Sequence, residues 1–148
     1  MKNNVVYFYK TMSQRLSFNE YFMNIAQQVK LRSPDIIKVG AIIVSNKNNT
    51  IISTGYNGAP RNCNDSIDWT DRSLVRSVVI HAEMNAILYA QSRFEDSTMY
   101  ITMSPCSQCI KLIAAANIKK IYYCTEYKDF STVKELCNYF NIELTQIE

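Results

Sequence analysis

Apolar and polar positions along the chain follow the periods of helices and strands, and they predict both kinds of element. The first helix is predicted to begin after Ser17, because Ser17 and Glu20 form an S-x-x-E capping box and apolar residues then recur at helical spacing. The dipeptide Ser33-Pro34 is expected to end this helix.

A hairpin and a long loop are predicted next. The apolar runs 39–44 and 50–57 flank the polar sequence SNKNN, which is typical of a β-hairpin. The segment from residue 58 to about residue 79 is polar and shows no regular period, so we expect it to be irregular. Loops of that length in a compact domain are usually functional or disordered.

The second half of the chain predicts helices and strands in alternation, which favours a central sheet sandwiched between helices. Thr132 and Glu135 are expected to cap the last helix. The expected elements are a helix over 81–91, a strand over 97–103, a helix over 105–116, a strand over 118–124, a helix from 132 to 140 and a strand over 142–147. We expect one domain over residues 1–148, with residues 1–16 as an N-terminal extension.

Composition and charge narrow the function. The net charge of +3 permits an anionic small molecule but does not suggest a stripe for nucleic acid. No apolar run reaches the length of a membrane span, and the first 14 residues show no signal-peptide pattern, so we expect a cytoplasmic protein without a membrane partner. In that compartment, closely spaced cysteines suggest metal binding or chemistry rather than a disulfide framework.

The sequence PCSQC places Cys106 and Cys109 at the predicted start of a helix. Side chains three residues apart lie on one helix face, so both sulfurs can reach one ion. Pro105 suits the first helical position, and the positive end of the helix dipole favours thiolates there.

The only histidine of the chain, His81, opens the other helix, and Glu83 follows two residues later. One histidine and two cysteines make three ligands and leave a fourth tetrahedral position for water, which is the arrangement of a catalytic zinc site. A lone C-x-x-C or H-x-E occurs easily by chance. The two together, each opening a helix on either side of a strand, are far less easily explained by coincidence.

The chain resembles the zinc-dependent cytidine and deoxycytidylate deaminase family, for which H-x-E…P-C-x-x-C is a known signature. The resemblance rests on HAEMNAI from His81 and PCSQCIKLIAAANIKKIYY from Pro105, and on VGAIIV and STGYNGAPR in the hairpin. It implies a three-layer α/β/α sandwich with a central mixed five-stranded sheet. The segment GYNG is most similar to the deoxycytidylate deaminases, although Asn62 follows Arg61 where those relatives commonly have glycine.

This resemblance implies a function and roles for single residues. Zinc on His81, Cys106 and Cys109 would activate water, and Glu83 would move protons while dCMP is deaminated to dUMP. The Ala82 N–H would contact the pyrimidine carbonyl, and Asn57 the sugar and the base, although YNG is also a good turn sequence. For the phosphate we consider Arg61 and Tyr127, each of which also suits a solvated surface position.

The family also implies regulation, with dCTP as activator and dTTP as inhibitor, magnesium on the triphosphate and a hexameric assembly. The effector segment would comprise Gly55, Tyr56, Asn57 and Gly58, with glycines that permit unusual backbone conformations. A simple hairpin exit without an effector is the alternative for these four residues.

Three other functions are considered. A deaminase of tRNA adenosine or single-stranded nucleic acid would share the zinc motif but should show a basic channel with aromatic stacking. A free-cytidine deaminase would need no phosphate site. A non-enzymatic zinc-stabilised module would need a fourth protein ligand, and Glu83 could serve as one, but nothing else in the sequence suggests a binding module.

Overall fold

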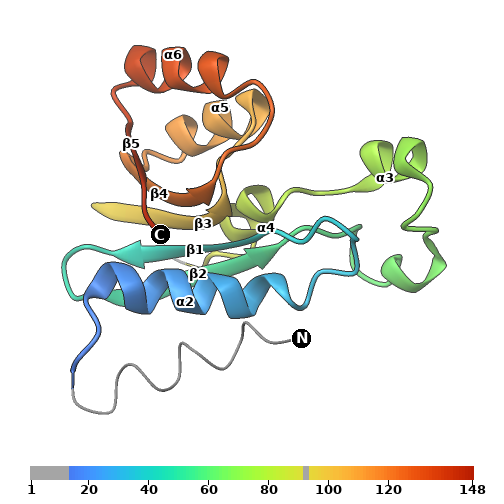
Figure 1. The fold of residues 1–148 in the computed structure, drawn as a ribbon, viewed down its shortest axis with the longest axis horizontal. Coiled ribbons are helices and arrows are strands. Elements are labelled where there is room, and N and C mark those ends of the chain that lie inside the picture. The colour runs from blue at the N-terminus through green and yellow to red at the C-terminus, as the bar shows by residue number, and fades with distance from the viewer. Residues whose placement is uncertain (1–13, 92–93) are drawn as a thin grey trace.

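A computed structural model gives the structure of residues 14–91 and 94–148 (Figure 1). Most of the predicted N-terminal extension, residues 1–13, lies outside the described residues. The first described helix is α2 (Phe18–Lys30), and the predicted capping box is present in full: the Ser17 side chain accepts from the Glu20 N–H while the Glu20 carboxylate accepts from the Ser17 N–H.

The five strands form one mixed sheet, as predicted. The strand order is β2-β1-β3-β4-β5. Strand β1 is antiparallel to both of its neighbours, whereas β3, β4 and β5 run parallel to one another. The strands are β1 (Gly40–Ser45), β2 (Thr50–Tyr56), β3 (Ser97–Met103), β4 (Lys120–Thr125) and β5 (Glu143–Gln146).

Helices cover both faces of this sheet, which confirms the three-layer sandwich (Figure 1). Alternate residues of β1 point to opposite faces: Ile42 and Val44 pack on α2, and Ala41 and Ile43 join the core of the other face. The opposite layer consists of α4 (Ala82–Leu88), α5 (Ser107–Ala115) and α6 (Phe130–Phe140). No helix in the described ranges is long and apolar enough to cross a membrane.

The segment 58–79 is not wholly irregular, contrary to the prediction. It contains a 3-10 turn, η1 (Asn64–Ser66), and a helix, α3 (Arg72–Val78), which projects to one side of the sandwich (Figure 1). Asp71 caps α3 by accepting hydrogen bonds from the N–H groups of Ser73 and Leu74. The two turns of α3 are too short for a clear apolar period, so the polar composition concealed them.

Two predicted helix starts were wrong. Helix α5 begins at Ser107 with Cys106 as its N-cap, so Pro105 precedes the helix instead of occupying its first turn. Helix α6 begins at Phe130 after Asp129, whose φ of 61° lies in the left-handed region, and not at a cap of Thr132 and Glu135.

Candidate active site

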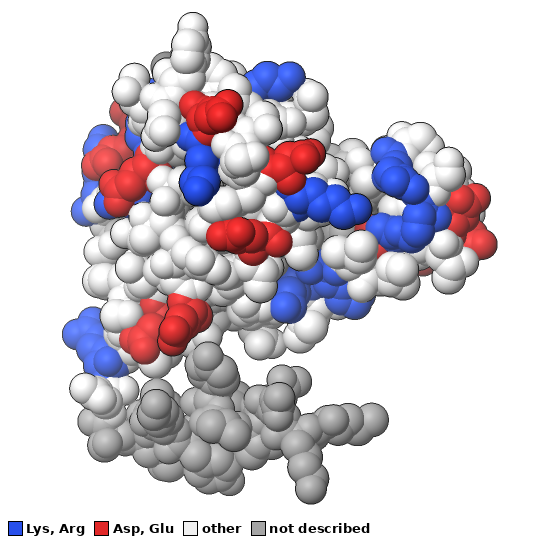
Figure 2. Space-filling view, turned by 45° about the horizontal axis from the view of Figure 1, so that its top comes forward, with Lys and Arg blue, Asp and Glu red and all other residues white. Residues whose placement is uncertain are grey.

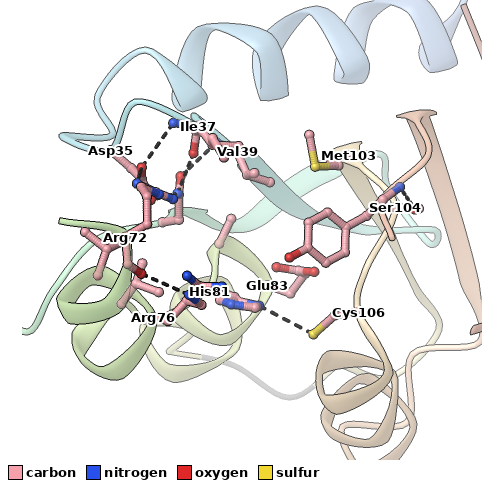
Figure 3. A pocket seen from close by; sticks show the side chains of 15 residues that line it. Asp35, Ile37, Val39, Arg72, Arg76, His81, Glu83, Met103, Ser104 and Cys106 are labelled. Carbon is pink, nitrogen blue, oxygen red and sulfur yellow. Dashed lines mark hydrogen bonds and ion pairs between the residues drawn. The ribbon is translucent and has the colours of Figure 1, made fainter. Parts of the chain in front are cut away.

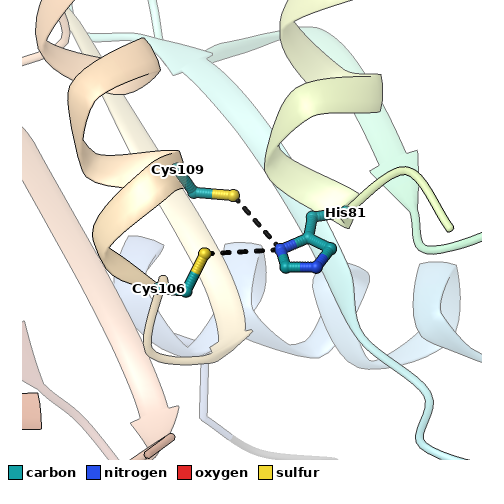
Figure 4. Close-up of side chains that lie close together, drawn as sticks. All are labelled: His81, Cys106 and Cys109. Atoms are coloured by element: carbon teal, nitrogen blue, oxygen red, sulfur yellow. Dashed lines mark hydrogen bonds between the residues drawn. The ribbon is translucent and has the colours of Figure 1, made fainter. Parts of the chain in front are cut away.

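Two helix N-termini meet on one face of the sheet and bring His81, Cys106 and Cys109 together (Figure 4). His81 is the N-cap residue of α4, and Cys106 is the N-cap residue of α5. Cys109 lies one turn further along α5, so its sulfur points to the same side as that of Cys106. The helices neighbour each other because β3 carries the chain from the end of one to the start of the next.

The three ligand atoms fit one zinc ion. The His81 Nδ1 atom lies 3.5 Å from the Cys106 Sγ and 3.3 Å from the Cys109 Sγ, and all three atoms lie within 4.8 Å of one another. Nitrogen and sulfur ligands at tetrahedral angles around one zinc ion lie roughly 3.5 Å apart. This is the only such cluster of three ligating side chains among the described residues, and it leaves one tetrahedral position open.

The three ligating groups shift one another's pKa values. A hydrogen bond from Cys109, together with the nearby His81, lowers the pKa of the Cys106 thiol to about 3. The same bond raises the pKa of Cys109, while contact with Cys106 raises the pKa of His81. Because metal ligands bind in their deprotonated form, zinc binding here would release the protons of Cys109 and His81.

Glu83 lies beside this cluster but outside it. Its side chain is 4% exposed, and burial raises its pKa to about 7. No carboxylate belongs to the three-ligand cluster found among the described residues. A carboxyl group with a pKa near neutrality can both accept and return a proton, as the predicted acid–base role requires.

One pocket joins this cluster to a polar region some distance away (Figure 3). In this view His81, Glu83 and Cys106 lie on one side of the pocket and Asp35 and Arg72 on the other, and Arg76 is drawn beside His81. The lining of this pocket is partly apolar. Its apolar side chains include Ile37, Val39, Val75, Val79 and Met103.

Three of the four predicted substrate residues line this pocket, namely Asn57, Ala82 and Tyr127. Arg61 does not. Its guanidinium lies 4.3 Å from the centroid of the Tyr89 ring, and both residues line a second pocket. Arg61 therefore does not line the pocket in which we expected it to bind the phosphate of the substrate.

Asn57 is 6% exposed and already bonded to the protein. Its Nδ2 atom donates to the Asp35 Oδ2 at 3.2 Å and to the Ile37 carbonyl at 2.8 Å, and its Oδ1 accepts from the Val39 N–H at 2.8 Å. Both amide protons are used. Asn57 thus fixes the turn before β1, and only the second lone pair of Oδ1 remains for a ligand.

The predicted effector segment lines the second pocket, with the exception of Asn57. Gly55, Tyr56 and Gly58 lie there beside Arg61. The argument from glycine conformation was wrong, because no glycine of the described residues has a positive φ. Gly55 is instead required for close packing on α4, where an added Cβ would lie 2.2 Å from the Ala82 carbonyl oxygen.

Sequence reasoning missed Asp35, Arg72 and Arg76. Both arginines lie in the segment that was expected to be irregular. The signal that could have found them is Asp71 before RSLVRSVV, in which Val75 and Val79 are four residues apart. Asp35 stands in a turn, where its side chain showed no periodic context.

Comparisons with known proteins agree with this geometry. The family model described as the cytidine and deoxycytidylate deaminase zinc-binding region matches residues 16–125. A probable deoxycytidylate deaminase of Caenorhabditis elegans is 33% identical over 141 residues, which cover 89% of this chain and 71% of that protein. The deoxycytidylate deaminase of Homo sapiens is 36% identical over 125 residues, covering 79% of this chain and 70% of the relative.

A solved structure is also similar. The dCMP deaminase of the cyanophage S-TIM5, in complex with dCMP and dUMP, superimposes with a TM-score of 0.75 and 28% identity, covering 90% of this chain and 99% of that one. Its fold and the His-Cys-Cys cluster place the present chain among the zinc-binding deaminases. The chain belongs to the cytidine and deoxycytidylate deaminase family and is a deaminase enzyme.

Proposed function

We propose that this enzyme hydrolyses dCMP to dUMP and ammonia. The observation that carries the proposal is a single pocket lined by the metal ligands His81 and Cys106, by the buried acid Glu83 and by two arginines. The relatives named as deoxycytidylate deaminases, and the similar structure that holds dCMP and dUMP, support the same substrate.

His81, Cys106 and Cys109 would hold the zinc ion, which when bound lowers the pKa of a coordinated water toward about 7. Glu83 then acts as the proton carrier at this end of the pocket. Its carboxylate would take one proton from the attacking water and deliver it to N3 of the cytosine. It would then take the second proton from the new C4 hydroxyl and give it to the amino group, which leaves as ammonia while the C4 carbonyl forms. One C–O bond forms and one C–N bond breaks, so water and dCMP give dUMP and ammonia.

Other pocket residues orient the nucleotide. The Ala82 N–H lies at the start of α4 and is proposed to donate to the pyrimidine carbonyl. Asn57 Oδ1 can accept one further hydrogen bond, for which the sugar hydroxyl is the proposed donor. Tyr127 is 40% exposed at the rim, and its N–H is fixed by the Ser104 hydroxyl at 2.8 Å, so its ring can border the bound nucleotide.

The phosphate is assigned to Arg76 rather than to Arg61. Arg76 lines the active pocket, and its Nε donates to the Arg72 carbonyl, which leaves both terminal nitrogens for a ligand. No carboxylate in the described part of the chain forms an ion pair with it. The Arg72 charge, by contrast, is taken by Asp35 at 2.7 Å.

A nucleic-acid substrate has less support. The face in Figure 2 shows basic and acidic side chains interspersed, without the continuous basic channel that a strand of tRNA would need. Incubating the zinc-loaded protein with dCMP, deoxycytidine, cytidine and a tRNA anticodon stem, while ammonia is measured, tests the proposal. We expect fastest release from dCMP. Faster release from the tRNA stem or from cytidine would overturn it.

Regulation is proposed on the family resemblance. The second pocket, bordered by Gly55, Tyr56, Gly58 and Arg61, is the proposed site for dCTP or dTTP with Mg²⁺. Helix α4 connects this pocket to the active site. Its Asn85 side chain donates to the Tyr56 carbonyl at 2.8 Å, and the same helix begins beside His81. We further propose a hexamer in the cytoplasm that supplies dUMP for dTMP synthesis.

The regulatory proposal has its own test. Initial rates with dCMP would be measured alone, with dCTP and Mg²⁺, and with dTTP, on protein sized by light scattering. We expect a sigmoidal dependence that dCTP makes hyperbolic and dTTP suppresses, with coupling of about 1–3 kcal/mol. A monomer whose rates ignore both triphosphates would contradict regulation and leave the catalytic proposal intact.

A further inference from the structure

Asp35 is a buried carboxylate in the wall of the active pocket, away from the metal ligands. It is 3% exposed. Its Oδ1 accepts from the Arg72 Nη1 at 2.7 Å and from the Ile37 N–H at 3.0 Å, and its Oδ2 accepts from the Asn57 Nδ2 at 3.2 Å. A buried charge is tolerated only when it is paired and hydrogen-bonded. Asp35 meets both conditions, because it pairs with Arg72 and both of its oxygens accept hydrogen bonds.

These bonds join three segments that are distant in the sequence. Asp35 belongs to the turn before β1, Asn57 follows β2, and Arg72 begins α3. Arg72 also makes a contact within its own segment: the same Nη1 atom donates to the Trp69 carbonyl at 3.1 Å. Asp35 is therefore the point at which α3 is tied to the turn and to the end of the hairpin (Figure 3).

Helix α3 depends on this connection because it projects from the sandwich (Figure 1). Within the described residues, the Asp35–Arg72 pair is the one ion pair that ties α3 to the rest of the protein. Val75 supplies an apolar anchor and the Gly58–Ile80 bridge follows the helix. The Arg72 carbonyl in turn holds the Nε of Arg76 at 3.0 Å.

We propose that Asp35 is a positioning residue for substrate binding: it holds Arg72, and through Arg72 it seats α3 so that Arg76 faces the phosphate of the nucleotide. This inference rests on the proposed function. It explains why Arg72 is paired with a carboxylate and Arg76 is not. The Asp35–Arg72 ion pair stiffens the pocket wall, and the charge of Arg76 remains for the ligand.

The first measurement reads the tether without any activity. Amide hydrogen exchange over residues 72–78 would be compared in the zinc-loaded wild type, Asp35→Asn and Arg72→Lys, with Asp65→Asn as a control. Asp65 is an exposed carboxylate of the same segment, so its change removes the same charge without touching the pair. We expect exchange in α3 to accelerate at least about tenfold in the first two variants, and to stay unchanged over residues 82–88. Unchanged exchange in α3 would overturn the tether.

The second measurement separates binding from chemistry. Asp35→Asn and Arg72→Lys should each raise the KM for dCMP by about tenfold or more, with kcat within a few-fold of wild type and zinc retained. In Arg72→Lys, which leaves the Asp35–Asn57 hydrogen bond in place, the KM for deoxycytidine should change much less, because that substrate lacks the phosphate. Asp35→Asn combined with Arg72→Lys should cost little more than either alone, since both break one connection.

The outcomes distinguish this inference from the proposed function. In Arg72→Lys, an equal loss of kcat/KM on dCMP and deoxycytidine, or a loss in kcat alone, would overturn the positioning role while the enzyme remained a dCMP deaminase. If wild-type protein released no ammonia from dCMP, the proposed function would fail, and with it the role of Arg76. The exchange result would then still report whether Asp35 seats α3.

Discussion

Gly55 lies so close to Ala82 that a Cβ on Gly55 would stand 2.2 Å from the Ala82 carbonyl oxygen and 2.4 Å from the Ala86 N. Ala82 is the residue between the zinc ligand His81 and the acid Glu83. The glycine of β2 therefore determines how closely α4 approaches the sheet, and with it where both side chains stand. The catalytic end of the pocket depends on a residue that does not line it.

The first prediction is that Gly55→Ala displaces the start of α4. It should destabilise the protein by about 1–3 kcal/mol, as overpacking does. It should also lower zinc content and kcat, since His81 and Glu83 move with the helix. Thermal unfolding, zinc content and dCMP turnover would be measured.

Gly40→Ala is the matched control for this change. An added Cβ there would lie 2.3 Å from the Ala26 carbonyl oxygen, on the opposite layer of the sandwich. A similar loss of stability with zinc retained is expected. Equal zinc loss in both variants would mean that Gly55 acts only through global stability.

The second prediction concerns the metal. Purified protein should hold about one zinc per chain, because three protein ligands and water complete a tetrahedral site. Replacement of Cys106 or Cys109 by Ala should remove both zinc and activity. Cys63→Ala should retain both, since Cys63 is exposed and lies outside the cluster. Full activity in metal-free protein would contradict the zinc site.

The third prediction concerns Glu83→Gln. The amide fits the same buried space and can hydrogen-bond, but it cannot carry a proton. Turnover should fall by about two to four orders of magnitude while zinc content and thermal stability stay close to wild type. If this variant lost its zinc instead, Glu83 would be a ligand and the site structural.

Much of the fold and the metal site could be predicted because their signals are local. The capping box of Ser17 and Glu20 and the continuous apolar run of β1 are read from neighbouring residues. His81 and the two cysteines each stand at a helix start that the sequence marks. Their meeting in space follows from two adjacent helices on one face of a sheet, which the order of elements already implies.

The rest of the pocket could not be predicted, because it depends on side chains that meet only in the folded chain. Nothing in the sequence around Asp35 shows that it pairs with Arg72, 37 positions away. Backbone conformation misled in a second way. In the described residues positive φ occurs at Asn and Asp positions such as Asn62 and Asp129, and never at glycine. Gly40 and Gly55 are instead required where a strand packs closely against a helix.

The central claim is that dCMP lies in one pocket with its base at Glu83 and its phosphate at Arg76. It is tested most directly by kcat/KM for dCMP and for deoxycytidine, measured on the zinc-loaded wild type, Arg76→Gln and Arg61→Gln. The wild type should prefer dCMP by at least about tenfold, because charge-assisted hydrogen bonds to the phosphate are strong. Arg76→Gln should lose most of that preference and Arg61→Gln should keep it. Equal use of both substrates by the wild type, or loss of the preference in Arg61→Gln alone, would contradict the account.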